Sequence, residues 1–408
     1  LIGQTEWVKW ETPILGPGEP GSWDERGVRG PSVIFHNGLF HMWYHGGNWD
    51  GETSIGYAYS EDGLSWEKWE NNPVLSVEHS VSSGWSITQI GIPSVIFHEG
   101  LFHMWFTCNT YPDYAVGYGT SADGMSWDLY MENPVIQSSG SNWESGGIIA
   151  GPVHFIEGMY HMWYTALIAN PGCMRGNINH ILSEDGFNWS HDGADIPVLA
   201  AGPSLWDSYM VGTCSVVNDG TTFEMWYTGY DSLVNRTGYA TSENNVGWIK
   251  DANNPVLNEG SDWVWDGGDA CWPSVIKEDG LYKMWYSGYS VANLPQIGYA
   301  SSSDSVAAGL RNSIIPHTAQ LHPAYPNPFN SEVNIHFELS KRVFVNLSIY
   351  SLTGDLVREL QSGYFPPGVH TILWRGKNAR GQATDSGIYL CQLKSPQNVQ
   401  TIKLTYLK

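Results

Sequence analysis

The chain alternates between short apolar runs and short polar turns, a pattern typical of β-strands. Apolar and polar positions also alternate within segments such as LFHMWYH, which begins at Leu39, as expected for strands that bury one face. The dipeptide Met-Trp recurs at intervals of 58 to 63 residues, at Met42, Met104, Met162, Met225 and Met284. A repeat of this length predicts one supersecondary unit per period.

Each period contains the pattern for about four strands. An apolar run such as PSVIF at 31–35 comes first, the Met-Trp strand and a third strand follow, and a turn such as SEDGLSW at 60–66 leads into the fourth. Four short strands per repeat predict a propeller blade. The fifth period lacks its last strand, and WVKWETPIL at 7–15 matches WEKWENNPVL at 66–75. The sequence therefore predicts an all-β, five-bladed β-propeller over 1–309, with the N-terminal strand closing blade five.

The last part of the chain has a different pattern. After a predicted linker at 310–322, alternating strands at 333–339 and 343–350 predict an antiparallel Ig-like β-sandwich over 323–408. The motifs PNPF, IYSLTG, SGIY and KLTYLK occur there in order, and together they resemble the C-terminal sorting domain of type IX secretion substrates. This resemblance implies a Gram-negative host of the Bacteroidota type, contact with the type IX secretion machinery, and a location outside the cell or on the outer-membrane surface.

Charge is distributed unevenly between the two predicted domains. From Leu310 onward there are 10 Lys and Arg against 5 Asp and Glu, a net charge of +5, whereas the residues before it carry 9 against 36, a net charge of −27. Such an acidic surface repels phosphate backbones, so nucleic acid is excluded as a partner class. No run approaches the ~20 apolar residues of a membrane-spanning helix, which predicts no membrane span.

The blade motifs resemble the five-bladed propellers of arabinanases, β-xylosidases, invertases and levansucrases. In those enzymes three carboxylates stand near the start of the innermost strands of the first three blades. Glycoside chemistry needs them because one carboxyl group donates a proton while another attacks or activates water. The matching positions here are Gly30, Ile92 and Ala150, none of which can exchange a proton. The resemblance therefore implies a glycosidase-like fold without the family's catalytic acids.

Other acids near the starts of blades are weaker catalytic candidates. Asp24, Glu144, Asp207 and Asp266 each follow a Trp that recurs from blade to blade, and a repeated feature is more typical of a turn or a cap than of chemistry. Glu25 and Asp269 are not repeated, so they are the better candidates for a displaced catalytic acid.

Aromatic and polar residues gather in the loops between second and third strands and near the blade starts, which lie on one face of a propeller. Aromatic rings stack on the C–H faces of sugars, while amides and charged groups bind their hydroxyls. The ligand-binding candidates on this face are Trp49, Asp50, Tyr111, Tyr114, Arg175, Tyr230, Trp263 and Trp272. Trp49, Trp263 and Trp272 interrupt the repeat; the alternative is that they plug the channel or pack loops.

The five cysteines, Cys108, Cys173, Cys214, Cys271 and Cys391, show no CxxC spacing. Cys214 and Cys271 fall near the starts of equivalent strands, where either a disulfide or two buried free thiols would fit. The sequence predicts no metal site and no cofactor.

Three functions stay open at this point. The first is a non-catalytic propeller that binds extracellular polysaccharide or glycan at the cell surface. The second is a structural or adhesive subunit of an extracellular assembly, a homo-oligomer in which the oppositely charged domains attract one another. The third is a glycoside hydrolase with displaced catalytic acids.

Overall fold

The computed structural model describes residues 7–81, 87–110, 113–169, 175–191, 196–261, 264–278, 280–290, 293–303, 320–321, 324, 326–339, 343–351, 355–366, 368–395 and 399–407. The chain divides into two compact units, Leu1–Val306 and Ala307–Lys408. Of the predicted linker at 310–322, only residues 320–321 belong to the described part.

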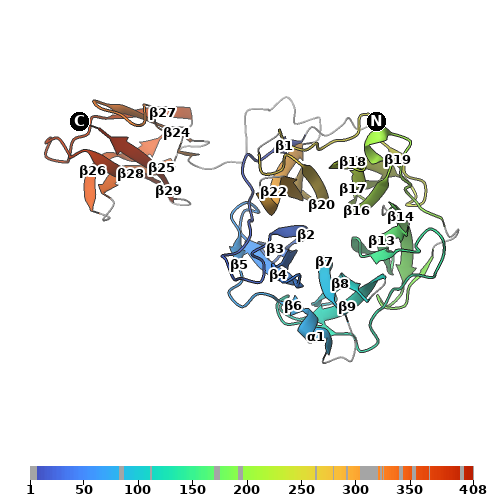
Figure 1. The fold of residues 1–408 in the computed structure, drawn as a ribbon. Helices are drawn as coiled ribbons and strands as arrows, with labels where there is room; N and C mark the ends of the chain where they lie inside the picture. The colour runs from blue at the N-terminus through green and yellow to red at the C-terminus, as the bar shows by residue number, and fades with distance from the viewer. Residues whose placement is uncertain are drawn as a thin grey trace. The chain divides into compact units, whose positions relative to one another are not determined.

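The first unit is a ring of antiparallel strand groups, which we call blades and number along the chain (Figure 1). Blades 1 and 2 comprise β2 (Val28–His36), β3 (Leu39–Gly47), β4 (Thr53–Ser60), β5 (Glu67–Lys68) and β6 (Leu75–Ser76), then β7 (Gln89–His98), β8 (Leu101–Asn109), β9 (Tyr114–Ser121) and β10 (Asp128–Leu129). Blade 3 comprises β11 (Gly147–Ile149), β12 (Val153–Ile156), β13 (Met159–Ile168), β14 (Arg175–Ser183) and β15 (Ser190–His191). Blade 4 comprises β16 (Met210–Asn218), β17 (Phe223–Tyr230), β18 (Asn235–Ser242) and β19 (Ile249–Lys250).

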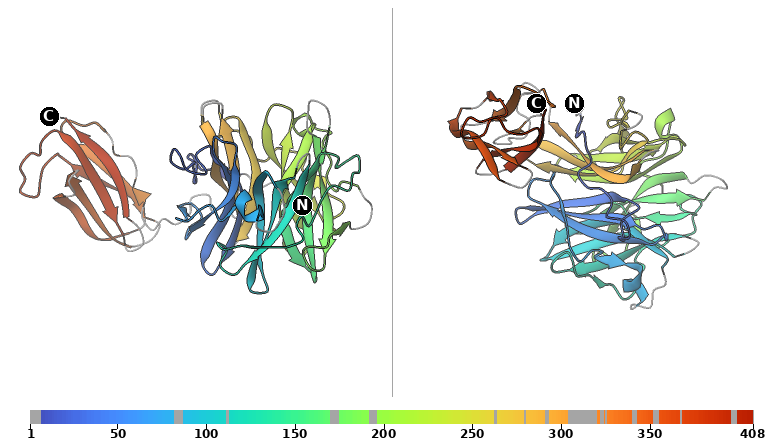
Figure 2. Two further views of the ribbon diagram at one scale, coloured as in Figure 1. Left: turned by 60° about the horizontal axis from the view of Figure 1, so that its bottom comes forward. Right: turned by 60° about the vertical axis from the view of Figure 1, so that its left-hand side comes forward.

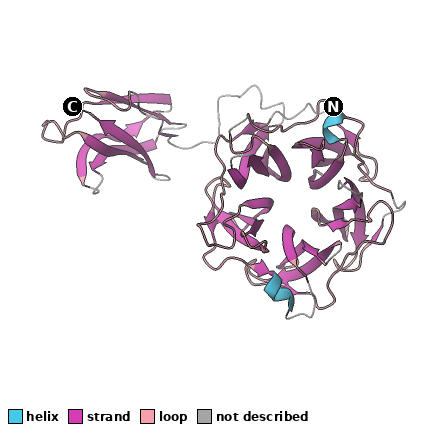
Figure 3. Cartoon of the chain, in the orientation of Figure 1, coloured by secondary structure: helices cyan, strands magenta, loops and turns pink. Residues whose placement is uncertain are grey.

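Blade 5 contains strands from both ends of the unit, namely β20 (Asp269–Glu278), β21 (Leu281–Ser290), β22 (Asn293–Ser303) and β1 (Val8–Lys9). β1 pairs antiparallel to β22, with Val8 opposite Ser301, and Leu15 forms a further bridge to Ile297. The prediction that the N-terminal strand completes this blade is confirmed. The described part of the chain is helical only at α1 (Val77–Val81) and in the short 3-10 helix η1 (Leu205–Asp207), so the all-β class is also confirmed (Figure 3).

The Met-Trp repeat forms the contact between neighbouring blades. The Trp of each of these dipeptides is fully buried in the second strand of its blade. Trp43 Nε1 in blade 1 donates a hydrogen bond to the Gly124 carbonyl in the Asp-Gly turn of blade 2, at 2.8 Å. Gly124 has a φ of +77°, and a Cβ there would lie 2.8 Å from the Trp43 ring. Trp105 of blade 2 and Trp285 of blade 5 make the same bond to the turns of blades 3 and 1, whereas Trp163 of blade 3 donates to the Asn245 side chain in the turn of blade 4.

The carboxylate that follows the repeated Trp ties the outer strand to its blade. Asp207 is completely buried, its Oδ2 lies 2.6 Å from Lys250 Nζ, and the Tyr227 hydroxyl donates to the same oxygen. The same arrangement occurs in Asp24 with Lys68 and Tyr44 and in Asp266 with Lys9 and Tyr286. These contacts support the interpretation of the repeated acids as structural.

The second unit is a sandwich of two antiparallel sheets (Figure 2). One sheet contains β23 (Gln320–Leu321), β24 (Val333–Leu339) and β27 (Gly368–Trp374); the other contains β26 (Leu356–Phe365), β25 (Val343–Ser351), β28 (Gly387–Lys394) and β29 (Val399–Tyr406). Alternate residues of β24, such as Ile335 and Phe337, pack into one core with Val345 and Leu347 of β25. The two strands predicted at 333–339 and 343–350 are confirmed.

Candidate functional site

The innermost strands of the blades surround a central channel of about 520 Å³, within the ~300–1,000 Å³ of ordinary ligand pockets. Serines of the Pro-Ser-Val motif join the blades along its wall. The Val33 N–H donates to Ser274 Oγ of the preceding blade and the Val95 N–H to Ser32 Oγ, both at 3.0 Å. The same bond recurs from Val153 to Ser94 and from Val275 to Ser215. Because these hydroxyls accept hydrogen bonds between blades, we assign them a structural role in the channel wall.

Blade 3 lacks this serine, because Pro152 is followed directly by Val153. His154 lies on the channel wall and bonds to the Val216 backbone of blade 4. Burial lowers its pKa to about 4, so the imidazole is neutral at physiological pH. His154 thus joins blades 3 and 4 without bringing a charge into the channel.

One position of the innermost strand is occupied by Gly30, Ile92, Ala150, Thr213 and Trp272 in blades 1 to 5, and all five residues line the channel. Among the described residues that line it, none is Asp or Glu. No carboxyl group of the described residues therefore faces the cavity from this wall, either as a general acid or as a nucleophile. That Gly30, Ile92 and Ala150 replace the catalytic acids of the glycosidases stays a prediction.

Four of these five residues have a left-handed backbone. Their φ angles are +57° at Gly30, +48° at Ile92, +32° at Thr213 and +53° at Trp272. For a residue other than glycine this conformation costs about 1–3 kcal/mol, and such costs concentrate at functional sites. Hydroxyl groups of the preceding blade fix three of them: Ser287 accepts from the Gly30 N–H, Thr165 from Thr213 and Thr228 from Trp272, at 2.8–2.9 Å.

Replacing Ile92 by glycine tests this strain. Because glycine adopts a positive φ freely, Ile92→Gly is expected to leave the stability unchanged or to raise it by up to about 1 kcal/mol, although it removes a half-buried side chain. The matched control is Ala150→Gly, at the one blade position without a positive φ, which is expected to cost about 0.5–1 kcal/mol. Thermal unfolding of both variants measures the difference, and an equal loss in both would contradict the assignment of strain.

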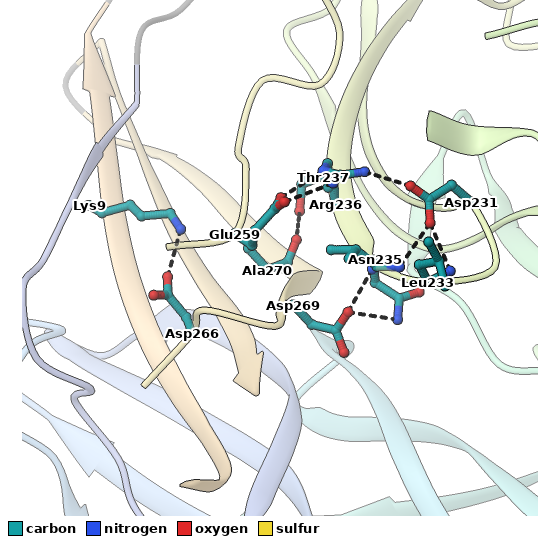
Figure 4. A network of polar contacts seen from close by, with 11 residues as sticks. Lys9, Asp231, Leu233, Asn235, Arg236, Thr237, Glu259, Asp266, Asp269 and Ala270 are labelled. Carbon is teal, nitrogen blue, oxygen red and sulfur yellow. Dashed lines mark hydrogen bonds and ion pairs between the residues drawn. The ribbon is translucent and has the colours of Figure 1, made fainter. Parts of the chain in front are cut away.

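The two candidate acids lie in different environments. Glu25 Oε2 accepts the Gly21 N–H at 2.6 Å, so this carboxylate closes its own surface turn. Asp269 begins β20, and its Oδ1 accepts the N–H and the side-chain amide of Asn235, at 2.6 and 3.1 Å (Figure 4). Burial raises the pKa of Asp269. Asp269 therefore has the environment of a carboxyl group that could hold a proton.

An arginine network beside Asp269 joins blades 4 and 5 (Figure 4). Arg236 forms a two-pronged ion pair with Glu259 at 2.6 and 2.7 Å and a further bond to Asp231 at 2.9 Å. Hydrogen bonding to this guanidinium lowers the pKa of Glu259. Thr237 Oγ1 donates to the Ala270 carbonyl at the start of β20. Glu259 is therefore bound to Arg236 and is not a free partner for Asp269.

Three arginines on the loop face, where the innermost strands start and the second strands end, lie over aromatic rings. The distance from guanidinium carbon to ring centre is 5.3 Å for Arg26 and Trp49, 5.6 Å for Arg29 and Trp272, and 5.5 Å for Arg175 and Tyr209. Such cation–π pairs hold both a flat apolar surface and a charged donor in place. The face thus offers the two kinds of group that bind sugars.

The predicted ligand-binding residues are spread over this face. Trp49 is 63% exposed, and Asp50 beside it is exposed. Tyr230 ends β17 and packs edge-on against Tyr209, and the Arg175 guanidinium lies over the Tyr209 ring. Tyr114 is half-buried at the start of β9, Trp272 lines the channel, and Tyr111 and Trp263 lie outside the described residues. Their role in binding stays a prediction.

Arg26, Arg29 and Tyr209 were not among the residues predicted from the sequence. The signal for Arg29 was present, since the equivalent residues of the other blades are Gly91, Ile149, Gly212 and Cys271. Cys214 and Cys271 are buried free thiols, so the disulfide alternative is wrong, and burial raises the pKa of both; Cys173 lies outside the described residues.

Comparison with known families decides the identity of the second unit. Residues 323–406 match the family model of the secretion system C-terminal sorting domain. The C-terminal unit is a sorting domain. The protein is therefore a type IX secretion substrate that is secreted or held at the cell surface. Within the described residues, no helix has the length and apolar character needed to cross a bilayer.

The propeller is similar to glycosidase propellers. Residues 148–307 match the family model of the glycosyl hydrolases family 32 N-terminal domain. A solved structure named glycoside hydrolase is 18% identical, with a TM-score of 0.59 over 72% of this chain and 92% of that one. A thermostable family-43 glycoside hydrolase is also 18% identical, with a TM-score of 0.54 over 67% and 88% of the two chains. These structures confirm the glycosidase-like propeller fold.

Curated relatives include an uncharacterized protein of Mycobacterium tuberculosis, 29% identical over 244 residues that cover 56% of this chain and 74% of the relative. A 1,2-beta-oligomannan phosphorylase of Thermoanaerobacter sp. is 25% identical over 128 residues, 29% of this chain and 42% of the enzyme. This chain thus matches less than half of the phosphorylase. Its homologues are of the glycoside hydrolase and phosphorylase type.

Proposed function

We propose that the propeller is a non-catalytic domain that binds glycan outside the cell. The glycosidase-like fold and the sorting domain support a carbohydrate partner in the extracellular space. The observation that carries the proposal is the channel wall, where Gly30, Ile92 and Ala150 face the cavity and no described lining residue is acidic. Because glycoside hydrolysis needs a paired acid and base, this wall favours binding over turnover.

The loop face supplies the binding groups in this proposal. Trp49 presents an exposed indole, and Arg26 lies over that ring. Tyr209 and Tyr230 form a second aromatic pair with Arg175. A sugar ring can stack its apolar C–H face on such an aromatic surface, and the adjacent guanidinium donates to hydroxyl groups.

The second candidate function is hydrolysis with Asp269 as a displaced acid. The observation that favours it is the half-buried Asp269 carboxyl group, whose pKa is raised by its partial burial. A raised pKa keeps the proton on the group to higher pH, as general acid catalysis requires. A partner carboxylate is also needed, and Glu259 is bound to Arg236 instead.

Binding is tested with the full-length protein on an array of plant, algal and microbial glycans, followed by calorimetry on the glycans retained. Trp49→Ala is expected to weaken binding about 3- to 10-fold, the loss of one stacking contact. Tyr364→Ala is the matched control, because Tyr364 is an aromatic residue that is 67% exposed in the sorting domain, and it should leave the affinity unchanged.

Turnover is tested on the same glycans by chromatography of the products. We expect no cleavage by the wild type. Cleavage that disappears in Asp269→Asn would establish the hydrolase instead, and an array on which no glycan is retained would overturn the binding proposal.

A further inference from the structure

We propose that Arg29, held over Trp272 at the channel mouth, binds the carboxylate of an acidic sugar. This inference rests on the proposed function and names the class of glycan. It assigns to the loop face a charged subsite that a neutral glycan would leave empty.

The ion pairs of the propeller distinguish Arg29 from most other cations. All five lysines before Leu310 lie 2.5–3.9 Å from a carboxylate, as Lys9–Asp266, Lys68–Asp24, Lys250–Asp207, Lys277–Glu224 and Lys283–Glu278. Arg236 is paired with two acids. Among the described residues, no carboxylate forms an ion pair with Arg29, although 36 acids and only 9 basic residues precede Leu310. A carboxylate from a ligand outside the chain would form the ion pair that Arg29 lacks.

The residues around Arg29 hold its guanidinium in place before any ligand binds. It lies over the Trp272 ring, and that ring packs edge-on against Tyr289 with centres 6.3 Å apart. The Trp272 backbone is strained and held by its bond to Thr228 Oγ1. Burial raises the pKa of Tyr289, while the charge of Arg29 and a hydrogen bond to it act in the opposite direction. Because the guanidinium has five N–H donors, several stay available for a ligand.

His45 is a second polar group beside this cation that lacks a partner. It lies opposite Arg29 in the pairing of β2 with β3, is 8% exposed, and neither ring nitrogen has a hydrogen-bond partner among the described residues. Other blades place Thr107, Thr165, Thr228 or Ser287 at this position, and each of those hydroxyls accepts an N–H of the next blade. Burial, followed by the charge of Arg29, lowers the pKa of His45, so the ring is neutral. Buried polar groups are nearly always satisfied, and an oxygen of a bound sugar would satisfy this one.

The charge balance favours a carboxylate over a more highly charged anion. A guanidinium matches a carboxylate geometrically, with two parallel hydrogen bonds. Asp269 begins the same blade 5 strand as Trp272, the adjacent Arg236 network joins that strand to blade 4, and the unit as a whole is acidic. One arginine neutralises a single negative charge there, whereas phosphate would add a second charge without a cation to balance it.

Calorimetry on the full-length protein tests the subsite with oligogalacturonate and oligoglucuronate, each compared with its neutral methyl ester. The wild type should bind at least one acid about 10-fold or more tightly than the ester, and this preference should fall as salt is raised. Arg29→Gln should abolish the preference while affinity for the ester is kept. Arg29→Lys keeps the positive charge but loses the two-pronged geometry of the guanidinium, so it should keep part of the preference for the acid. Arg380→Gln, which removes an exposed arginine of the sorting domain, is the matched control and should keep all of it.

The outcomes separate this inference from the function on which it rests. Equal affinity for acid and ester, or a preference that survives in a folded Arg29→Gln variant, would overturn the carboxylate subsite and leave glycan binding intact. Inorganic phosphate that binds as tightly as the acidic sugar would overturn the choice of a carboxylate. If neither acid nor ester binds and the array also stays empty, both proposals fail together.

Discussion

Replacing Asp207 by alanine is expected to destabilise the propeller by about 3–5 kcal/mol, the cost of breaking a buried ion pair from one side. The carboxylate is completely buried and lies 2.6 Å from Lys250 Nζ, which also donates to the carbonyls of Ala200 and Gly202. Without Asp207, the ammonium and the Tyr227 hydroxyl lose their shared acceptor. Urea unfolding followed by tryptophan fluorescence measures the loss, because every blade buries a tryptophan.

Two further variants separate the ion pair from the general effect of a substitution. Asp50→Ala removes an exposed acid of the same unit and should leave the unfolding midpoint unchanged. The double variant Asp207→Leu with Lys250→Met replaces both charges by apolar groups and should recover much of the lost stability. If Asp207→Ala unfolds at the wild-type midpoint, the repeated acid is not what holds the outer strand in place.

The fold could be predicted well from the sequence because each blade repeats the same contacts with its neighbour. The Met-Trp strand and the Asp-Gly turn recur together because the Trp of one blade donates to the turn of the next, as Trp43 does to Gly124. Any change in one partner affects a neighbour, so the pattern stays readable along the chain. The Trp-Asp pairs recur for the same reason, since each carboxylate anchors an outer strand.

The candidate site was harder to predict, because it depends on contacts that do not repeat. The positive φ values of Gly30, Thr213 and Trp272 are held by hydroxyl groups of the preceding blade, and nothing near those residues in the sequence indicates them. Arg29 and Trp272 are 243 positions apart in the sequence but stack across the junction between blades 5 and 1. Arg29 and Trp272 each occur in one blade only, so the repeat pattern of the sequence does not indicate that they form a pair.

Of the changes considered, removing residues 1–15 is expected to reduce the stability of the propeller most. This truncation deletes β1, the edge contact of Trp7 with Trp226 at 6.0 Å, and the ion pair of Lys9 with Asp266 at 2.6 Å. It also removes Leu15, which is 5% exposed between blades. The buried ion pair and the lost apolar contacts together predict a loss of more than about 5 kcal/mol in the unfolding free energy of the propeller.

The truncated chain should also associate, because the exposed edge of β22 presents unpaired backbone groups to other chains. Size-exclusion chromatography should show oligomers, and thermal unfolding should begin well below the wild-type temperature. A synthetic peptide of residues 1–15 should restore both properties, since the strand is joined to blade 5 by pairing and not by chain continuity with β22. A peptide carrying Lys9→Gln should restore them less, because Asp266 then remains buried without its cation. A truncated chain that stays monomeric with wild-type stability would mean that the other contacts between blades 5 and 1, such as Trp285 to Gly63, are enough to close the ring.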